Sequence, residues 1–143
     1  MKVYLVAHAP TSVQRLEDLA KLAFNFGEPV EAFVVTKPSG AAAQIGLAEV
    51  SKLAYKLDKR LLIFPDIDDA IELLKPDVVY TLSYEFGERI KKLEGERVML
   101  VVGASEPGLS KVEAQKGKPI YPEGPEGNIG PIASAALLLG GLK

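Results

Sequence analysis

GPEGNIGPIASAALLLGG, residues 124–141, joins a glycine- and proline-rich segment directly to a run of small and apolar residues. Glycine and proline interrupt regular structure, so the first half predicts a loop. Pro131 suits the first turn of a helix, and Asn128 or Gly130 can cap it. We therefore predict a helix over Ile132–Leu139, whose small residues allow close packing against a sheet or another helix. Whether the loop binds a ligand or only connects two elements depends on what precedes it.

A second glycine-containing loop lies just upstream. Val98–Val102 (VMLVV) predicts a strand that ends at Gly103, and a second glycine follows at Gly108. Gly103 can let the backbone approach a ligand closely or take a positive φ. Pro119–Tyr121 predicts a short extended segment before the loop described above. Two loops of this composition therefore follow two consecutive strands.

The rest of the chain alternates between apolar runs, which predict strands, and segments of helical periodicity. Strands are predicted at Lys2–Ala7, Pro29–Thr36, Arg60–Phe64 and Val78–Leu82, and helices at Ser12–Phe26, Ala42–Leu57, Asp66–Leu74 and Glu85–Leu93. This alternation predicts an α/β fold, a mostly parallel sheet with helices on both faces, in a single domain over residues 1–143. Ligands of such sheets bind at the carboxyl ends of the strands.

Composition excludes several kinds of site. The 143 residues include no cysteine and only one histidine, so disulfides, thiolate metal sites and histidine-rich metal sites are ruled out. Neither a signal peptide nor a membrane-spanning segment is recognisable, which predicts a cytoplasmic protein. The formal net charge of −2 means that a nucleic-acid partner would need a local basic patch.

Several polar residues near predicted strand ends have both a functional and a structural interpretation. His8 follows the first strand and is either a base or, as we favour, a residue that caps a loop. The aspartates of PDIDDA are Asp66, Asp68 and Asp69. They resemble a magnesium-binding cluster, but acidic residues are also favoured at a helix start, and we prefer the helix-start interpretation. Lys37, with Ser39 and Gly40, fits a phosphate site and a simple turn equally well.

The region after the fourth strand holds weaker signals. Ser83, Tyr84 and Glu85 are candidates for lining a substrate cleft. Arg89, Lys91 and Lys92 form a basic cluster that fits either RNA-backbone contacts or a solvated helix face, and we favour the solvated face.

The sequence resembles a known family at this point. VVGASEPGLS (101–110) followed by GPEGNIGPIASAALLL (124–139) looks like the last two motifs of the SPOUT class of RNA methyltransferases. In that class a strand ends in an FGxExxGLS loop, and a proline-rich loop with an Asn-containing turn leads into an Ala-rich helix. AFNFG (23–27) is similar to the AFG of their first motif, and SGAAAQIG (39–46) to their SxGA segment. The resemblance covers most of the chain and is nearest to a compact archaeal branch labelled RecB-like, which lacks an appended RNA-binding domain.

The resemblance implies a fold that composition cannot show. Members of the class thread the C-terminal segment through a loop, and the resulting trefoil knot holds S-adenosylmethionine. Arg97 to the C-terminus would form the knotted part here. The class is typically dimeric, which implies a homodimer whose interface is supplied by the first helix, Ser12–Phe26, and the last helix.

Adenine is flat and apolar on its faces and polar at its edge, so apolar walls and backbone groups of glycine-rich loops suit it. The candidate wall residues are Leu82, Val102, Leu109, Ile120 and Ile129, and the candidate backbone contacts are Gly103, Gly127, Asn128 and Gly130. Tyr121, Pro122 and Ser134 complete the predicted cofactor-binding set.

Catalytic candidates follow from the first motif. Many members carry an arginine five residues before the FG, a spacing that falls on Lys21 here, and the Asn of that motif is missing. Arg15, six residues further upstream, is the preferred RNA-facing or catalytic cation, and a surface pair with Glu17 or Asp18 is the structural alternative. Glu106, in the loop after Gly103, completes the catalytic candidates. This departure from the motif leaves ribose 2′-O-methylation open.

The expected function is S-adenosylmethionine-dependent methylation of RNA, either tRNA or rRNA. Two alternatives remain: a SPOUT-like protein that binds RNA or a partner without catalysis, and a flavodoxin-like nucleotide-binding module.

Overall fold

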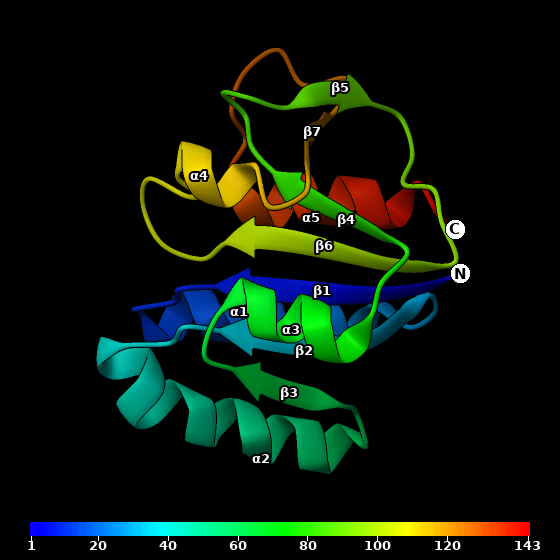
Figure 1. Ribbon diagram of the computed structural model, residues 1–143. Helices are drawn as coiled ribbons and strands as arrows, with labels where there is room; N and C mark the ends of the chain where they lie inside the picture. The colour runs from blue at the N-terminus through cyan, green and yellow to red at the C-terminus, as the bar shows by residue number, and fades with distance from the viewer.

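One sheet of seven strands, all parallel, runs through the computed structural model, which describes residues 1–143 (Figure 1). The strand order is β3-β2-β1-β6-β4-β7-β5. The strands are β1 (Lys2–His8), β2 (Val30–Thr36), β3 (Leu61–Phe64), β4 (Val78–Leu82), β5 (Glu88–Ile90), β6 (Arg97–Gly103) and β7 (Lys118–Pro122). The predicted parallel α/β fold is confirmed.

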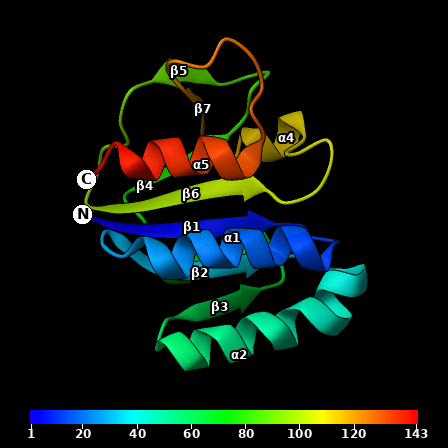
Figure 2. The same cartoon turned by 180° about the vertical axis from the view of Figure 1, so that it is seen from behind.

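Helices cover both faces of the sheet. They are α1 (Val13–Phe26), α2 (Leu47–Leu57), α3 (Ile67–Leu74), α4 (Lys111–Ala114) and α5 (Pro131–Gly140), and a π-helical turn over Ala42–Gly46 leads into α2. Helices α1 and α5 lie on one face with α2 beside α1, whereas α3 and α4 lie on the other (Figures 1 and 2). No helix combines the length and the hydropathy that crossing a membrane requires.

Each face of the sheet has its own hydrophobic core. The larger core joins α1, α2 and α5 to the sheet, and Leu16, Leu19 and Leu138 are buried in it. Helix α1 forms because its buried residues recur at helical spacing and because the Ser12 hydroxyl accepts a hydrogen bond from Arg15 N. The smaller core packs α3 against the other face, with Ile67 fully buried.

Strand β6 is the sixth strand in the chain but lies near the middle of the sheet, between β1 and β4. Its register with β1 runs from Lys2 opposite Arg97 to His8 opposite Gly103. The carboxyl ends of these two strands therefore lie side by side, and His8 neighbours the start of the loop that follows β6.

The predicted helix over Glu85–Leu93 is wrong. This segment turns after β4 and then forms β5, an edge strand paired with β7. Gly87 sits against backbone: a Cβ there would lie 2.6 Å from the carbonyl oxygen of Ile120, and Gly87 N donates to Ser83 O at 3.0 Å. Phe86, Ile90 and Leu93 have helical spacing, but this turn prevents a helix.

A short helix, α4, was not predicted. Its signal is Ser110-x-x-Glu113, a capping box in which Glu113 N donates to Ser110 Oγ and Ser110 N donates to Glu113 Oε1. Strand β7 extends one residue beyond each end of the predicted Pro119–Tyr121 segment.

Candidate functional site

A cleft of about 220 Å³ opens at the carboxyl ends of β4, β6 and β7. Three loops and the start of α1 surround it. Its lining residues are Arg15, Leu82, Ser83, Tyr84, Glu85, Phe86, Gly103, Ser105, Glu106, Pro107, Gly108, Leu109, Tyr121, Asn128, Gly130 and Pro131. The cleft is where parallel sheets place their ligands.

Many of the predicted site residues meet in this cleft. Its lining includes the cofactor candidates Leu82, Leu109, Gly103, Tyr121, Asn128 and Gly130, and the catalytic candidates Arg15 and Glu106. Val102 and Ile120 are fully buried within the sheet and do not line the cleft. Pro122, Gly127, Ile129, Ser134 and Lys21 do not line it either, and Lys21 is exposed on α1.

The first loop, 103–110, folds back tightly onto the end of β6. A Cβ on Gly103 would lie 2.6 Å from Leu109 N and 2.7 Å from the carbonyl carbon of Gly108. No side chain fits at position 103, because the opposing atoms are backbone. Gly103 is therefore needed for close approach of the loop itself, whereas Gly108 takes a positive φ of 100°.

The second loop, which leads into α5, is anchored by the hydroxyl of Tyr121. Ile129 N donates to Tyr121 Oη at 3.0 Å, and Asn128 Oδ1 lies 3.2 Å from the same hydroxyl. Asn128 Oδ1 also accepts from Gly130 N at 2.9 Å, which forms the turn before α5. The buried hydroxyl of Ser134 contacts Tyr121 Oη at 2.8 Å and Gly130 O at 2.6 Å. Ser134 and Tyr121 thus hold the end of the loop through buried and partly buried hydrogen bonds.

The third loop, between β4 and β5, carries aromatic side chains. Ser83 Oγ accepts from Phe86 N at 3.1 Å, which closes the turn. The rings of Tyr84 and Tyr121 pack edge to face with centroids 5.1 Å apart. The Arg89 guanidinium lies 4.9 Å from the centroids of both rings and donates to the carbonyl oxygens of Tyr84 and Gly87. Arg89 is thus a support for this loop rather than part of a solvated helix face.

Arg15 reaches the cleft from the first turn of α1. Its guanidinium lies 3.4 Å from Glu106 Oε1 across the rim, and not beside Glu17 or Asp18 as the structural alternative supposed. The Arg15 side chain is 29% exposed and that of Glu106 is 81% exposed, so the pair is open to solvent. A pair of this kind holds a side chain loosely and is easily exchanged for a ligand.

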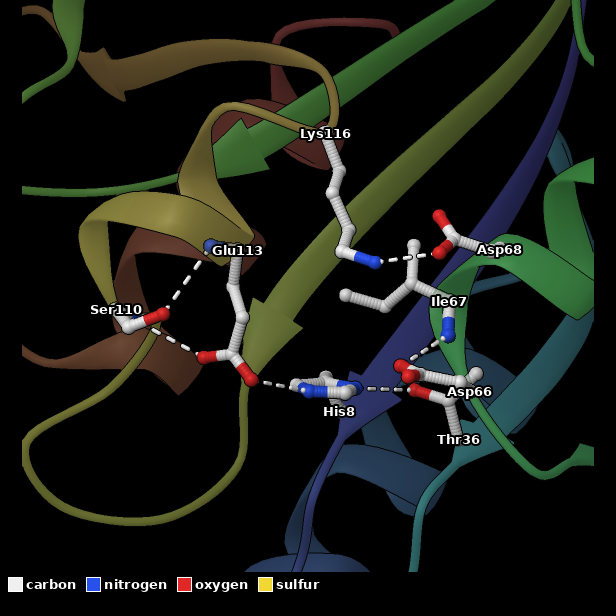
Figure 3. A network of polar contacts seen from close by, with 8 residues as sticks. All are labelled: His8, Thr36, Asp66, Ile67, Asp68, Ser110, Glu113 and Lys116. Carbon is white, nitrogen blue, oxygen red and sulfur yellow. Dashed lines mark hydrogen bonds and ion pairs between the residues drawn. The ribbon is translucent and has the colours of Figure 1, made fainter.

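A buried polar network lies beside the cleft (Figure 3). His8 is 2% exposed, with its Nδ1 2.8 Å from Thr36 Oγ1 and its Nε2 2.8 Å from Glu113 Oε2. Burial alone would raise the pKa of Glu113, but hydrogen bonds from Ser110 N and His8 outweigh it and lower that pKa. His8 therefore ties strands to α4 and does not reach the cleft lining.

The aspartates of the PDIDDA segment begin α3. Asp66 Oδ1 accepts from Ile67 N at 2.7 Å as the N-cap, and Asp68 pairs with Lys116 Nζ at 2.6 Å (Figure 3). The hydrogen bond to Asp68 raises the pKa of Lys116. No group of three or more His, Asp or Glu side chains is placed to hold a metal ion.

Sequence reasoning missed several cleft residues. Phe86, Ser105 and Pro107 line the cleft but were not singled out, and Pro131 was predicted only as a helix start. The available signal was proximity in sequence, because each lies within or next to a loop that already contained a candidate. Lys37, the phosphate candidate, is exposed after β2 and does not line the cleft.

Solved structures share this fold at low sequence identity. The SpoU methyltransferase AviRb from Streptomyces viridochromogenes, in complex with AdoMet, superposes with a TM-score of 0.73 at 13% identity, over 98% of this chain and 56% of that one. A probable methyltransferase from Bordetella pertussis Tohama I gives 0.67 at 14% identity, over 99% and 96% of the chains. A structure described as "Structural insights into the 2-OH methylation of C/U34 on tRNA" gives 0.70 at 19% identity, over 95% and 84%. These similarities show that the chain shares its fold with these proteins.

Relatives with higher sequence identity carry a different name. "Putative type II restriction enzyme ApeKORF2002P" of Aeropyrum pernix is 41% identical over 97% of this chain and 91% of its own length. "Putative type II restriction enzyme MjaORF1200P" of Methanocaldococcus jannaschii is 33% identical over 96% and 94%. A family model described as "RecB-family nuclease (DUF2122)" matches residues 40–141. The label RecB-like expected from the sequence agrees with this description, and the protein belongs to the family that bears it.

Proposed function

We propose that this protein is an S-adenosylmethionine-dependent methyltransferase that acts on RNA. The observation that carries the proposal is the cleft itself, in which the loops after β4, β6 and β7 converge in a fold shared with an AdoMet-bound structure. The family description and the names of the relatives point to nucleases, so the proposal rests on the site and on the fold.

The cleft has the chemistry that an adenosine needs. Leu82 and Leu109 provide apolar walls, and the Tyr121 ring adds an aromatic one. Gly108 and Gly130 line the cleft at positive φ, and a Cβ at either would meet nothing within 4 Å, so their backbone is accessible to a ligand. Backbone N–H and C=O groups at such positions can read the polar edge of the base. When bound, S-adenosylmethionine would supply an activated methyl group.

Arg15 and Glu106 are the residues that we propose bind and activate the RNA group that accepts the methyl group. Arg15 carries a fixed positive charge at the cleft rim, where it can hold an RNA phosphate or orient an acceptor oxygen or nitrogen. Its loose pair with Glu106 leaves the guanidinium available. Glu106 is also exposed enough to accept a proton from the incoming group. Lys21 lies outside the cleft lining and serves as the natural control for Arg15.

The homodimer and the knot are parts of the same proposal. Helices α1 and α5 lie side by side on one face of the sheet (Figure 2), and Leu137 on α5 is 50% exposed. An exposed leucine on a helix made almost wholly of apolar residues suits a subunit interface. Strand β7 lies between β4 and β5, so the connection over residues 83–87 crosses β7, and Gly87 lies against the backbone of Ile120. This crossing supports the proposed knot.

Calorimetric titration with S-adenosylmethionine and S-adenosylhomocysteine is the first test, with ATP and NAD as controls. We expect micromolar binding of both sulfur nucleosides, and loss of binding in Asn128→Trp, where the new ring would fill the cleft. Binding of ATP or NAD without binding of either sulfur nucleoside would overturn the proposed methyltransferase function and favour a generic nucleotide-binding module.

Transfer is tested by incubating the protein with RNA and S-adenosylmethionine labelled on its methyl group. Arg15→Ala should lower incorporation about a hundredfold, because a misplaced acceptor forfeits that much rate. Lys21→Ala, on the same helix but away from the cleft, should transfer as the wild type does. Incorporation should also fall steeply with salt if RNA phosphates are bound.

A parallel assay with duplex DNA and Mg²⁺ addresses the names of the relatives. Cofactor binding without incorporation would indicate a binding protein that has lost catalysis. DNA cleavage that resists Asn128→Trp, without any binding of the sulfur nucleosides, would replace the proposal with a nuclease.

A further inference from the structure

His8 holds both ends of the loop that forms one wall of the cleft. Its backbone carbonyl accepts a hydrogen bond from Ala104 N at 2.9 Å, at the point where the loop leaves β6. Its ring Nε2 lies 2.8 Å from Glu113 Oε2, just beyond the point where the loop enters α4 (Figure 3). Between these contacts lie Ser105, Glu106, Pro107, Gly108 and Leu109, all of which line the cleft.

Glu113 connects His8 to the loop, because its carboxylate contacts both His8 and Ser110. Its second carboxylate oxygen accepts from Ser110 N at 2.9 Å, and Glu113 N donates to Ser110 Oγ at 3.1 Å. One carboxylate therefore joins the imidazole to the last residue of the loop. Gly108 and Leu109 are packed against Gly103, where even a Cβ would not fit, so we expect a movement of the adjoining Ser110 to displace the cleft-facing residues.

The imidazole that anchors this arrangement is itself fixed. His8 is 2% exposed and Thr36 is fully buried, and their side chains are 2.8 Å apart. The Thr36 hydroxyl can donate to a neutral ring or accept from a charged one, so either form of the ring keeps the contact. Rotation of the ring would break the buried hydrogen bond to Thr36 and the partly buried one to Glu113, which is costly.

We propose that His8 is a positioning residue, which sets the placement of the 104–110 loop through Glu113 and so determines cofactor affinity without touching the ligand. The identity of the ligand rests on the function proposed above, whereas the effect of His8 on the loop does not.

The test combines two measurements on His8→Leu. The variant should bind S-adenosylhomocysteine about tenfold more weakly, the effect of one lost hydrogen bond. Its amides over 104–110 should also exchange with deuterium faster than those of the wild type. His8→Gln, whose amide can still donate to Glu113, should recover part of both effects and covers the case in which His8→Leu does not fold.

Two further variants separate positioning from general destabilisation. Val50→Ala removes buried methyl groups from α2, far from the loop, and should lower the melting temperature while leaving both readouts unchanged. In a Glu113→Gln background, His8→Leu should cause less loss of affinity than it does alone, because the two residues act in series.

Wild-type affinity and wild-type exchange in His8→Leu would overturn the proposal. If the wild type binds neither sulfur nucleoside, the proposed function fails, and exchange over 104–110 still decides whether His8 holds the loop.

Discussion

The two glycine-rich loops that face each other across the cleft are held in different ways. The 103–110 loop is packed on backbone at Gly103 and is tied at both ends to His8. The loop after β7 is tied near its end, where the Tyr121 hydroxyl meets Ile129 N and Asn128, while Gly124, Glu126 and Gly127 are exposed. One wall of the cleft is therefore built before any ligand arrives. The other has few contacts to lose and can adjust to a ligand.

Among the substitutions that compare the two loops, Gly103→Ala should have the largest effect on stability and on ligand binding. The new Cβ would lie 2.6 Å from Leu109 N, so the packed loop must shift, at a cost of about 1–3 kcal/mol of stability. S-adenosylhomocysteine binding should be lost with it. Gly127→Ala is the matched change in the other loop, where a Cβ meets nothing within 4 Å, and it should be tolerated. Chemical denaturation and calorimetry measure both, and equal effects would erase the difference between the loops.

Tyr121→Phe should release the second loop. The free energy of unfolding should fall by about 1 kcal/mol, because Ile129 N loses its acceptor. Tyr80→Phe is the control, since the Tyr80 hydroxyl also contacts a loop backbone, at Glu94, but away from the cleft. Only Tyr121→Phe should weaken binding of S-adenosylhomocysteine. A similar loss in Tyr80→Phe would show that the cofactor senses overall stability and not the second loop.

The acid dependence of stability should report on the first loop. The folded state lowers the pKa of Glu113 below its ordinary value of 4.5, so this group stabilises the fold above pH 4.5. That contribution is lost as the pH falls through the lowered folded pKa. Thermal melts between pH 5 and pH 3 should therefore show a smaller pH dependence for Glu113→Gln than for the wild type. If the melting temperatures of the two proteins change with pH in parallel, the ionised carboxylate of Glu113 does not stabilise the loop.

Glu106→Gln should have the smallest effect on stability. The Arg15–Glu106 pair spans 3.4 Å at an exposed rim, and such pairs contribute at most about 1 kcal/mol. Melting curves with and without added salt should nearly coincide for the variant and the wild type. A large loss of stability would mean that the 103–110 loop depends on the Arg15–Glu106 pair as well as on His8.

The sequence was sufficient to predict the sheet because its strands are near-continuous apolar runs, such as Val98–Val102, which only a sheet covered on both faces accommodates. The position of the cleft followed from the same pattern, since parallel strands present their ligand loops at one edge. The segment after β4 was predicted wrongly because Phe86, Ile90 and Leu93 have helical spacing, and the contact of Gly87 with β7 depends on tertiary structure.

The contacts that hold the loops could not be predicted in this way. His8 and Glu113 are 105 residues apart, and nothing local in either segment indicates the other. The Tyr121 hydroxyl is a similar case, because the extended segment 119–121 showed that its ring would be near the cleft but not which groups its oxygen would meet. Periodicity and turn chemistry describe regular elements and their ends, whereas these contacts join a strand to a helix or to a loop whose path only the folded structure defines.

The place of β6 in the sheet has a consequence for how the protein is made. The pairing of β1 with β6 joins Lys2 to Arg97, so the first strand to leave the ribosome waits for most of the chain before its second neighbour exists. Until then β1 has one unpaired edge and β4 has two, and these edges are exposed to other nascent chains. Distant pairing of this kind slows folding. Cells that produce this protein rapidly therefore face an aggregation risk during translation, one that the finished sheet no longer shows.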